Sequence, residues 1–169
     1  NGGDALVAAR FLEDYELRVV LLGRPGTITT DIARENWAAV ERAAYPAEAV
    51  RDSSQVDLGE PTLFVDAMLG TGISGALREP AATVAAAMNE SEATVLSADV
   101  PSGLDADDGT LADNAVAADH VVTFHDTKPG LDSVDASVTV ADIGIPDATE
   151  RFVERGDLLR LGRDPASHK

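Results

Sequence analysis

The chain has 169 residues, enough for one domain with a buried core. Apolar residues make up 44% and aromatic residues only 4%, which predicts a core of small aliphatic side chains, as in parallel sheets covered by helices. No apolar run has the roughly 18 residues needed to span a membrane. The absence of cysteine excludes disulfides and thiolate zinc sites, and it fits a cytoplasmic protein.

The net charge is −17, from 30 acidic and 13 basic residues. Such a charge argues against a general nucleic-acid or membrane surface, because both partners are polyanions. The acids are spread along the whole chain and form no block, so we favour adaptation to concentrated salt over an acidic binding tail. At about 1 M salt the Debye length is only about 3 Å, and the self-repulsion becomes harmless.

Helix-like and strand-like segments alternate along the chain. Apolar spacing predicts helices over residues 4–14, where Asp4 is in N-cap position, 30–44 and 80–90. Short apolar runs predict strands over residues 17–22, 62–69, 94–98, 120–124 and 138–143. This alternation predicts an α/β fold with a mostly parallel sheet covered by helices on both faces.

Both ends of the chain look incomplete for such a fold. A parallel sheet of this kind normally begins with a strand before the first helix, so we expect the first strand to be missing from this chain. Residues 1–149 form the expected domain, and the polar residues 150–169 are expected to be a linker towards a further domain.

Four segments at predicted strand ends or helix starts carry candidate chemistry, because ligands of parallel sheets bind beyond the carboxyl ends of the strands. The first is Asn1-Gly2-Gly3-Asp4, at the start of a helix. Bare amides and the helix dipole there suit an anion such as a phosphate. Simple capping by Asp4 explains the same residues equally well.

The second segment is a glycine-rich loop, Gly70 to Gly75, which reads GTGISG. It predicts a phosphate-binding loop. The dinucleotide fingerprint, however, needs its last glycine packed within the following helix, whereas Pro80 places the helix start several residues later. A flexible turn is the alternative.

The third segment, residues 97–105, and the fourth, residues 123–131, each contain one candidate functional residue. Asp99, at a strand end before Pro-Ser-Gly, is a candidate general acid or base, or else a turn cap. Lys128 is the one lysine in the expected folded region, and it is either a phosphate ligand or a solvated side chain. His120 and His125 are interpreted as ordinary structural residues.

Asp66 precedes the glycine loop, where a phosphate is expected. Two anions in one cleft repel unless a cation lies between them. Asp66, Asn1 and Ser102 offer only oxygen ligands with a single carboxylate, which suits a monovalent hard cation. A buried hydrogen-bond acceptor is the alternative for Asp66.

Taken in order, the segments NGGDALVAARFL, DAMLGTGISGALREP, SADVPSGLDADDG, TFHDTKPGL and VADIGIP resemble the NAD(P)H-hydrate epimerase family, or YjeF N-terminal domain. They cover residue 1 to about 146. The resemblance implies a three-layer αβα, Rossmann-like domain that interconverts the R and S forms of hydrated NADH and NADPH (NADHX and NADPHX). It also implies a potassium ion held by Asn1, Asp66 and Ser102.

The resemblance also implies which residues contact the substrate. Asp99 would be catalytic, moving a proton at the C6 hydroxyl during either loss and re-addition of that hydroxyl or ring opening. The expected substrate-binding residues, with Lys128 added from its own chemistry, are Asn1, Gly2, Gly3, Asp4, Gly70, Thr71, Gly72, Ile73, Ser74, Gly75, Ala76, Asp99 and Lys128.

The chain departs from the family pattern at its start. The Gly-Asn that normally precedes Asn1 is absent, and Ala5 replaces a glycine. Residues 163–169 (RDPASHK) resemble the opening of an ADP-dependent dehydratase domain, so we expect a bifunctional parent with a fused dehydratase. The rival functions are an NAD-dependent oxidoreductase and a non-catalytic nucleotide-binding module. The sequence leaves a homo-oligomer open.

Overall fold

The computed structural model describes residues 2–43, 45–72 and 75–145. The predicted linker over residues 150–169 and the dehydratase-like residues 163–169 lie outside this part of the chain. Within it, every helix is too short or too polar to cross a membrane.

The predicted α/β class is confirmed, and each predicted helix and strand is present. The elements are α1 (Gly3–Ala9), β1 (Val19–Leu22), α2 (Asp31–Arg42), β2 (Ala47–Val50), β3 (Leu63–Asp66), α3 (Ala81–Asn89), β4 (Thr94–Ala98), β5 (His120–Phe124) and β6 (Ser137–Ala141). Short 3₁₀ turns lie at η1 (Pro25–Thr27), η2 (Ser53–Gln55) and η3 (Pro129–Ser133).

Three details differ from the prediction. Strand β2 was not predicted, because its sequence Ala-Glu-Ala-Val has too few large apolar residues to stand out. The helix predicted over residues 4–14 ends at Ala9 and tightens into i→i+3 turns. The strand predicted to reach residue 69 ends at Asp66, whose own carboxylate accepts a hydrogen bond from the Met68 amide and so turns the chain.

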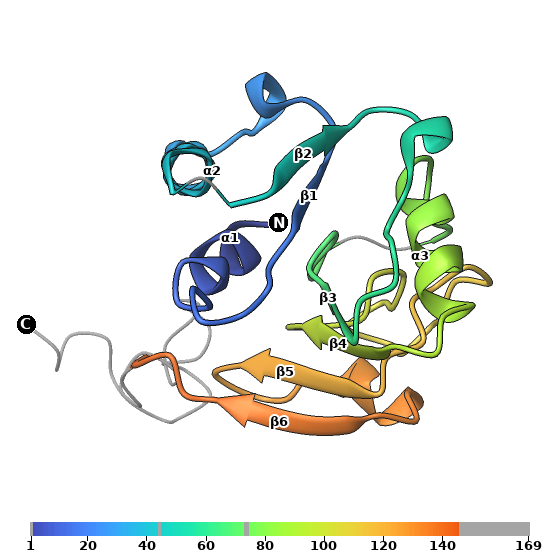
Figure 1. Ribbon diagram of the computed structural model, residues 1–169. Helices are drawn as coiled ribbons and strands as arrows, with labels where there is room; N and C mark the ends of the chain where they lie inside the picture. The colour runs from blue at the N-terminus through green and yellow to red at the C-terminus, as the bar shows by residue number, and fades with distance from the viewer. Residues whose placement is uncertain (1, 44, 73–74, 146–169) are drawn as a thin grey trace, which may run out of the picture.

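All strand pairs are parallel, but they divide between two sheets. One contains β1 and β2, and the other has the order β3-β4-β5-β6. In Figure 1, β3 lies between β4 and the two-stranded sheet. Among the described residues no strand pairs with the second edge of β3. The predicted first strand stays a prediction.

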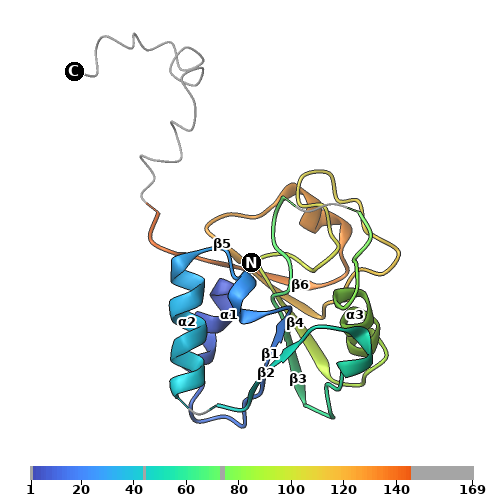
Figure 2. The ribbon, with the colours of Figure 1, turned by 90° about the horizontal axis from the view of Figure 1, so that it is seen from above.

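The helices lie on different sides of the sheets, as Figures 1 and 2 show: α1 and α2 pack together, and α3 lies apart from them. Small aliphatic side chains fill the core, as expected. Val84 and Ala85 of α3 pack against Phe64 and Val95 of the four-stranded sheet. A separate cluster around Trp37 joins α1 and α2 to the smaller sheet.

The parallel pairing places the carboxyl ends of β3, β4 and β5 at one edge, so their loops are neighbours. Gly130 fastens two of these loops together. Its amide donates to the Ala106 carbonyl over 2.8 Å. A Cβ on Gly130 would lie 2.2 Å from the Asp105 carbonyl oxygen, which is backbone and cannot rotate away. Only glycine fits this position.

We expect Gly130→Ala to lower the free energy of unfolding by about 1–3 kcal/mol, because the added methyl group must push two backbone segments apart. Gly26→Ala is the matched control, since nothing lies within 4 Å of a Cβ there. Urea unfolding followed by circular dichroism measures both variants. Equal midpoints for the two would show that the loop contact is not tight.

Candidate functional site

Asp66 ends β3 fully buried, and four hydrogen bonds hold its carboxylate. Oδ1 accepts from the Ser102 hydroxyl at 2.7 Å and from the Met68 amide at 3.2 Å. Oδ2 accepts from the Ser102 amide at 2.8 Å and from the Ser97 hydroxyl at 2.9 Å. The four lone-pair directions of the carboxylate are thus taken by these donors, which is the geometry of the buried hydrogen-bond acceptor given above as the alternative for Asp66, and a cation would have to displace one of them.

These bonds bring Asp66 and Ser102 together across 36 residues of sequence. The Ser102 hydroxyl also accepts from the Leu69 amide at 3.0 Å, so the loops after β3 and β4 share one hydroxyl group. Ser97 was missed as a site residue. It pairs with Asp66 in the β3–β4 register and therefore points to the same face. That register is not readable from a single strand.

The charge of Asp66 meets only neutral donors within the described residues. No described lysine or arginine forms an ion pair with it. Buried carboxylates normally pair with a cation. Two of the four donors are backbone amides, and the other two are the Ser97 and Ser102 hydroxyls, whose oxygens suit a hard ion of low charge. No group of three His, Cys, Asp or Glu that could hold a metal ion occurs in the described part. Asn1, the third expected ligand, lies outside it.

Asp99 follows β4 in an unusual backbone conformation. Its φ is 70°, and its amide donates to the Val122 carbonyl at 2.7 Å. The Val100 amide donates to the Ala98 carbonyl at 3.0 Å, and this bond between residues i and i+2 around a positive φ is typical of the strained form of the γ-turn. Strained residues of this kind concentrate at functional sites, which supports the prediction that Asp99 is one.

His125 repeats this conformation at the end of the neighbouring strand. Its φ is also 70°, and the Asp126 amide bonds to the Phe124 carbonyl at 2.8 Å. Two adjacent parallel strands therefore end in the same strained turn. The sequence did not predict this, because neither residue is a glycine.

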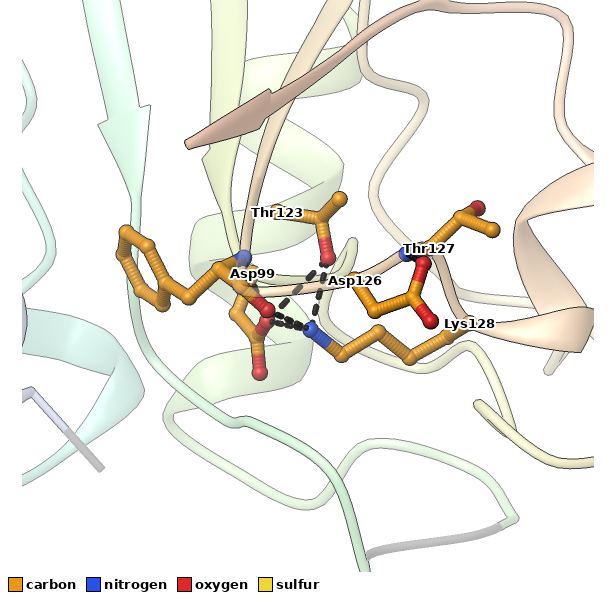
Figure 3. Close-up of polar contacts among 6 residues, drawn as sticks. Asp99, Thr123, Asp126, Thr127 and Lys128 are labelled. Carbon is orange, nitrogen blue, oxygen red and sulfur yellow. Dashed lines mark hydrogen bonds and ion pairs between the residues drawn. The ribbon is translucent and has the colours of Figure 1, made fainter. Parts of the chain in front are cut away.

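One oxygen of the Asp99 carboxylate receives three hydrogen bonds, drawn in Figure 3. Oδ1 accepts from Lys128 Nζ at 2.6 Å, from the Thr123 hydroxyl at 3.2 Å and from the Phe124 amide at 3.3 Å. The Asp99 and Lys128 side chains are each 21% exposed. Thr123 is fully buried and was missed, since a threonine within a strand usually serves β-propensity alone.

A small cavity joins three of the four predicted segments. Its lining includes Asp4 of α1, Leu69 and Gly70 after β3, and Asp99 after β4. Gly2 lies against this edge as well, because a Cβ there would be 3.6 Å from the Ala67 carbonyl oxygen. The expected convergence of these segments on one rim of the sheet is therefore present.

The remaining predicted site residues are less closely placed. Gly2, not Asp4, is the N-cap of α1, so the capping interpretation of Asp4 is wrong; Asp4 lies in the first turn. Gly3 begins the helix, with open space around it. Gly72 and Gly75 have positive φ values of 87° and 84°, which favour glycine. Thr71 and Ala76 do not line the cavity. Asn1, Ile73 and Ser74 lie outside the described residues.

The fold and this rim define a parallel α/β protein with a small cavity at the carboxyl ends of its strands, where proteins of this class bind their ligands. The family model described as "YjeF-related protein N-terminus" matches residues 1–130, and the chain belongs to this family.

Two curated relatives set the scale of the similarity. The bifunctional NAD(P)H-hydrate repair enzyme Nnr of Methanothermobacter thermautotrophicus is 44% identical over the whole of this chain, which spans 35% of that protein. The NAD(P)H-hydrate epimerase of Cenarchaeum symbiosum is 41% identical over 90% of this chain and 74% of its own length. The chain thus spans about a third of the bifunctional relative and about three quarters of the shorter one.

A solved structure supports the fold. The crystal structure of the yeast protein YNL200c superimposes with a TM-score of 0.70 over 97% of this chain and 68% of that chain, at 22% identity. The predicted Rossmann-like class is confirmed.

We expect Ser97→Ala to lower the free energy of unfolding by about 1–3 kcal/mol, because it leaves a buried carboxylate oxygen of Asp66 one hydrogen bond short. Ser137→Ala, at an exposed position on β6, is the control. Thermal and urea unfolding measure both variants. A cost at residue 97 no larger than that at residue 137 would contradict the role given to the Ser97 hydroxyl.

Proposed function

We propose that this chain is an epimerase domain that interconverts the R and S forms of hydrated NADH and NADPH. The observation that carries the proposal is Asp99, which a strained turn and three donors fix at the cavity shared with Asp4 and Gly70. The names of the relatives, an NAD(P)H-hydrate epimerase and a bifunctional NAD(P)H-hydrate repair enzyme, support the substrate class.

Asp99 is the proposed catalytic residue. Exchange of configuration at C6 requires a group that moves a proton to or from the C6 hydroxyl, whether that hydroxyl leaves or the ring opens. A carboxylate beside the cavity meets the geometric requirement for such a group. Of the substrate-binding residues expected from the sequence, we propose Asn1 to Asp4, Gly70 to Ala76 and Asp99, and we leave out Lys128.

The rival function of an NAD-dependent oxidoreductase fits less well. The dinucleotide fingerprint packs its third glycine inside the helix that follows. Here Gly75 is the third glycine of the loop, and α3 begins only at Ala81. The loop therefore lacks the helix start on which a dehydrogenase places its pyrophosphate.

We also propose a potassium ion at Asp66 and Ser102, with Asn1 as the third ligand. The buried carboxylate without a described cationic partner supports a bound cation. The uncharged hydroxyl oxygens of Ser97 and Ser102 support an ion of low charge. When bound, the ion would supply a positive charge at the Asp66 carboxylate.

Four broader features belong to the same proposal. A fused ADP-dependent dehydratase domain is supported by the bifunctional relatives, of which this chain covers about a third. Adaptation to concentrated salt is supported by the net charge of −17. The cytoplasmic location and a homo-oligomeric state remain predictions.

We expect Asp99→Asn to slow epimerisation about 10²–10⁴-fold, the usual contribution of a general acid or base. Purified S-hydrate is incubated with the full-length protein, and the R and S forms are separated by chromatography. Asparagine tolerates the positive φ of this position, so the backbone is preserved. Asp107→Asn, in the exposed part of the loop after β4, is the control.

Wild-type protein that leaves the S-hydrate unchanged would contradict the proposed function and favour a non-catalytic binding module. Equal rates for wild type and Asp99→Asn would remove Asp99 from the chemistry.

We expect potassium to stabilise the wild-type protein and not Asp66→Asn. At about a hundred times its Kd an ion adds about 2.7 kcal/mol, which raises Tm by roughly 5–10 °C. Melting is compared in potassium, sodium and choline chloride at one ionic strength, with Asp107→Asn as control. A second series, in which the concentration of all three salts is raised together, measures charge screening by the rise in Tm that they share. Identical melting in potassium and choline would argue against the ion.

A further inference from the structure

Lys128 turns its ammonium group towards the protein. In Figure 3 it points at Asp99 and Thr123. Nζ donates to Asp99 Oδ1 at 2.6 Å, to the Thr123 hydroxyl at 2.8 Å and to the Phe124 carbonyl at 2.8 Å. An ammonium group has three N–H donors, and each of them has a protein acceptor here.

This geometry bears on the phosphate contact expected for Lys128 from the sequence. To bind Lys128, a phosphate oxygen would have to displace one of these three acceptors. If the displaced acceptor were Asp99 or Thr123, a short, partly buried hydrogen bond would be lost. The geometry therefore favours contacts of Lys128 with other protein groups over a contact with a phosphate.

The backbone around Lys128 holds it in place from both sides. Before it, the strained turn at His125 ends β5. After it, Pro129 opens the 3₁₀ turn η3, and Gly130 packs against the carbonyls of Asp105 and Ala106. Lys128 is therefore anchored to the loop that begins with Asp99.

The two oxygens of the Asp99 carboxylate have different surroundings. Every hydrogen bond that the described residues give this side chain goes to Oδ1. In Figure 3 the other oxygen points away from Lys128. Asp99 also lines the cavity with Asp4 and Gly70. Oδ2 is thus the oxygen open to a ligand within the described surroundings.

We propose that Lys128 is a positioning residue that acts through Asp99, a role that rests on the proposed epimerase function. Its ammonium fixes Oδ1 directly and also through Thr123, whose hydroxyl accepts from Lys128 and donates to Asp99. Oδ2 then carries the proton exchanged with the C6 hydroxyl and returns it before product leaves, so the protein ends the cycle unchanged.

The first test is Lys128→Met in the full-length protein, which removes the charge and keeps the length of the side chain. We expect kcat to fall about 10²-fold, the typical cost of a misplaced catalytic group. KM for NADPH hydrate and the Kd of NADP⁺ stay within about twofold, because no substrate contact is lost. Lys128→Arg keeps the positive charge and should recover part of kcat. Recovery stays incomplete because a planar guanidinium cannot direct three N–H groups from one nitrogen.

Arg42→Met, at the end of α2, is the matched loss of one cation away from this edge of the sheet. We expect it to behave as wild type. A tenfold or greater rise in the Kd of NADP⁺ for Lys128→Met alone would overturn the proposal in favour of a phosphate contact.

The double variant Asp99→Asn with Lys128→Met separates action through Asp99 from independent action. If Lys128 acts only through that carboxylate, the double variant is no slower than Asp99→Asn alone. Rate losses that multiply would overturn the proposal. Wild-type protein inactive on the hydrate would instead refute the proposed function, whereas active wild type with fully active Lys128→Met would refute only the positioning role.

Thr123 gives a second route if Lys128→Met fails to fold, as judged by circular dichroism. Thr123→Val removes the hydroxyl that links Lys128 to Asp99 and leaves the ammonium in place. We expect a fall in kcat of about tenfold, with KM unchanged, and recovery in Thr123→Ser, which restores the hydroxyl. Full activity of Thr123→Val together with that of a folded Lys128→Arg would overturn the proposal.

Discussion

The carboxylate of Asp66 is the interaction on which the arrangement of the site depends. It is a charge at zero exposure, and it is held by donors from β4 and from both loops that follow β3 and β4. Because an unpaired buried charge is costly, these donors cannot move independently of it. Asp66 at the end of β3 thus fixes Ser97 and Ser102. Asp99 lies between these two serines in the sequence, so its position is fixed as well.

A second polar centre lies one strand further along the sheet. Asp99, Thr123 and Lys128 form it where β4 and β5 end, and Gly130 fastens the two loops by backbone contact. Both centres use the same face of the sheet: Asp66 pairs with Ser97, and Thr123 lies on the neighbouring strand. The loops after β3, β4 and β5 therefore meet through two hydrogen-bond networks with a carboxylate in each, and the first segment joins them through Asp4 in the cavity lining.

The sequence predicted elements and segments better than contacts. Apolar runs located β3, β4, β5 and β6, although the cover predicted for both faces of the sheet is incomplete: only alternate residues of β3, β4 and β5 are buried, and β6 is exposed along most of its length. The proximity of Asp66 and Ser102 was expected from electrostatics and is present, whereas their role as cation ligands stays a prediction. Ser97 and Thr123 were missed because their importance comes from strand register and from the neighbouring strand, which periodicity does not encode. Lys128 was recognised by its rarity, but its direction depends on the turn at His125.

The left-handed backbone at Asp99 and His125 has a consequence for how the chain tolerates change. Aspartate, asparagine and histidine enter positive φ more often than other non-glycine residues, and glycine does so freely, whereas a β-branched residue there is a steric outlier. At residue 99 an alanine variant would therefore mix a loss of chemistry with a change in backbone energy, and glycine would relax the loop while deleting the carboxylate. The fold gives up stability at both strand ends, and at Asp99, which borders the cavity, a substitution that restores stability would come at the expense of function.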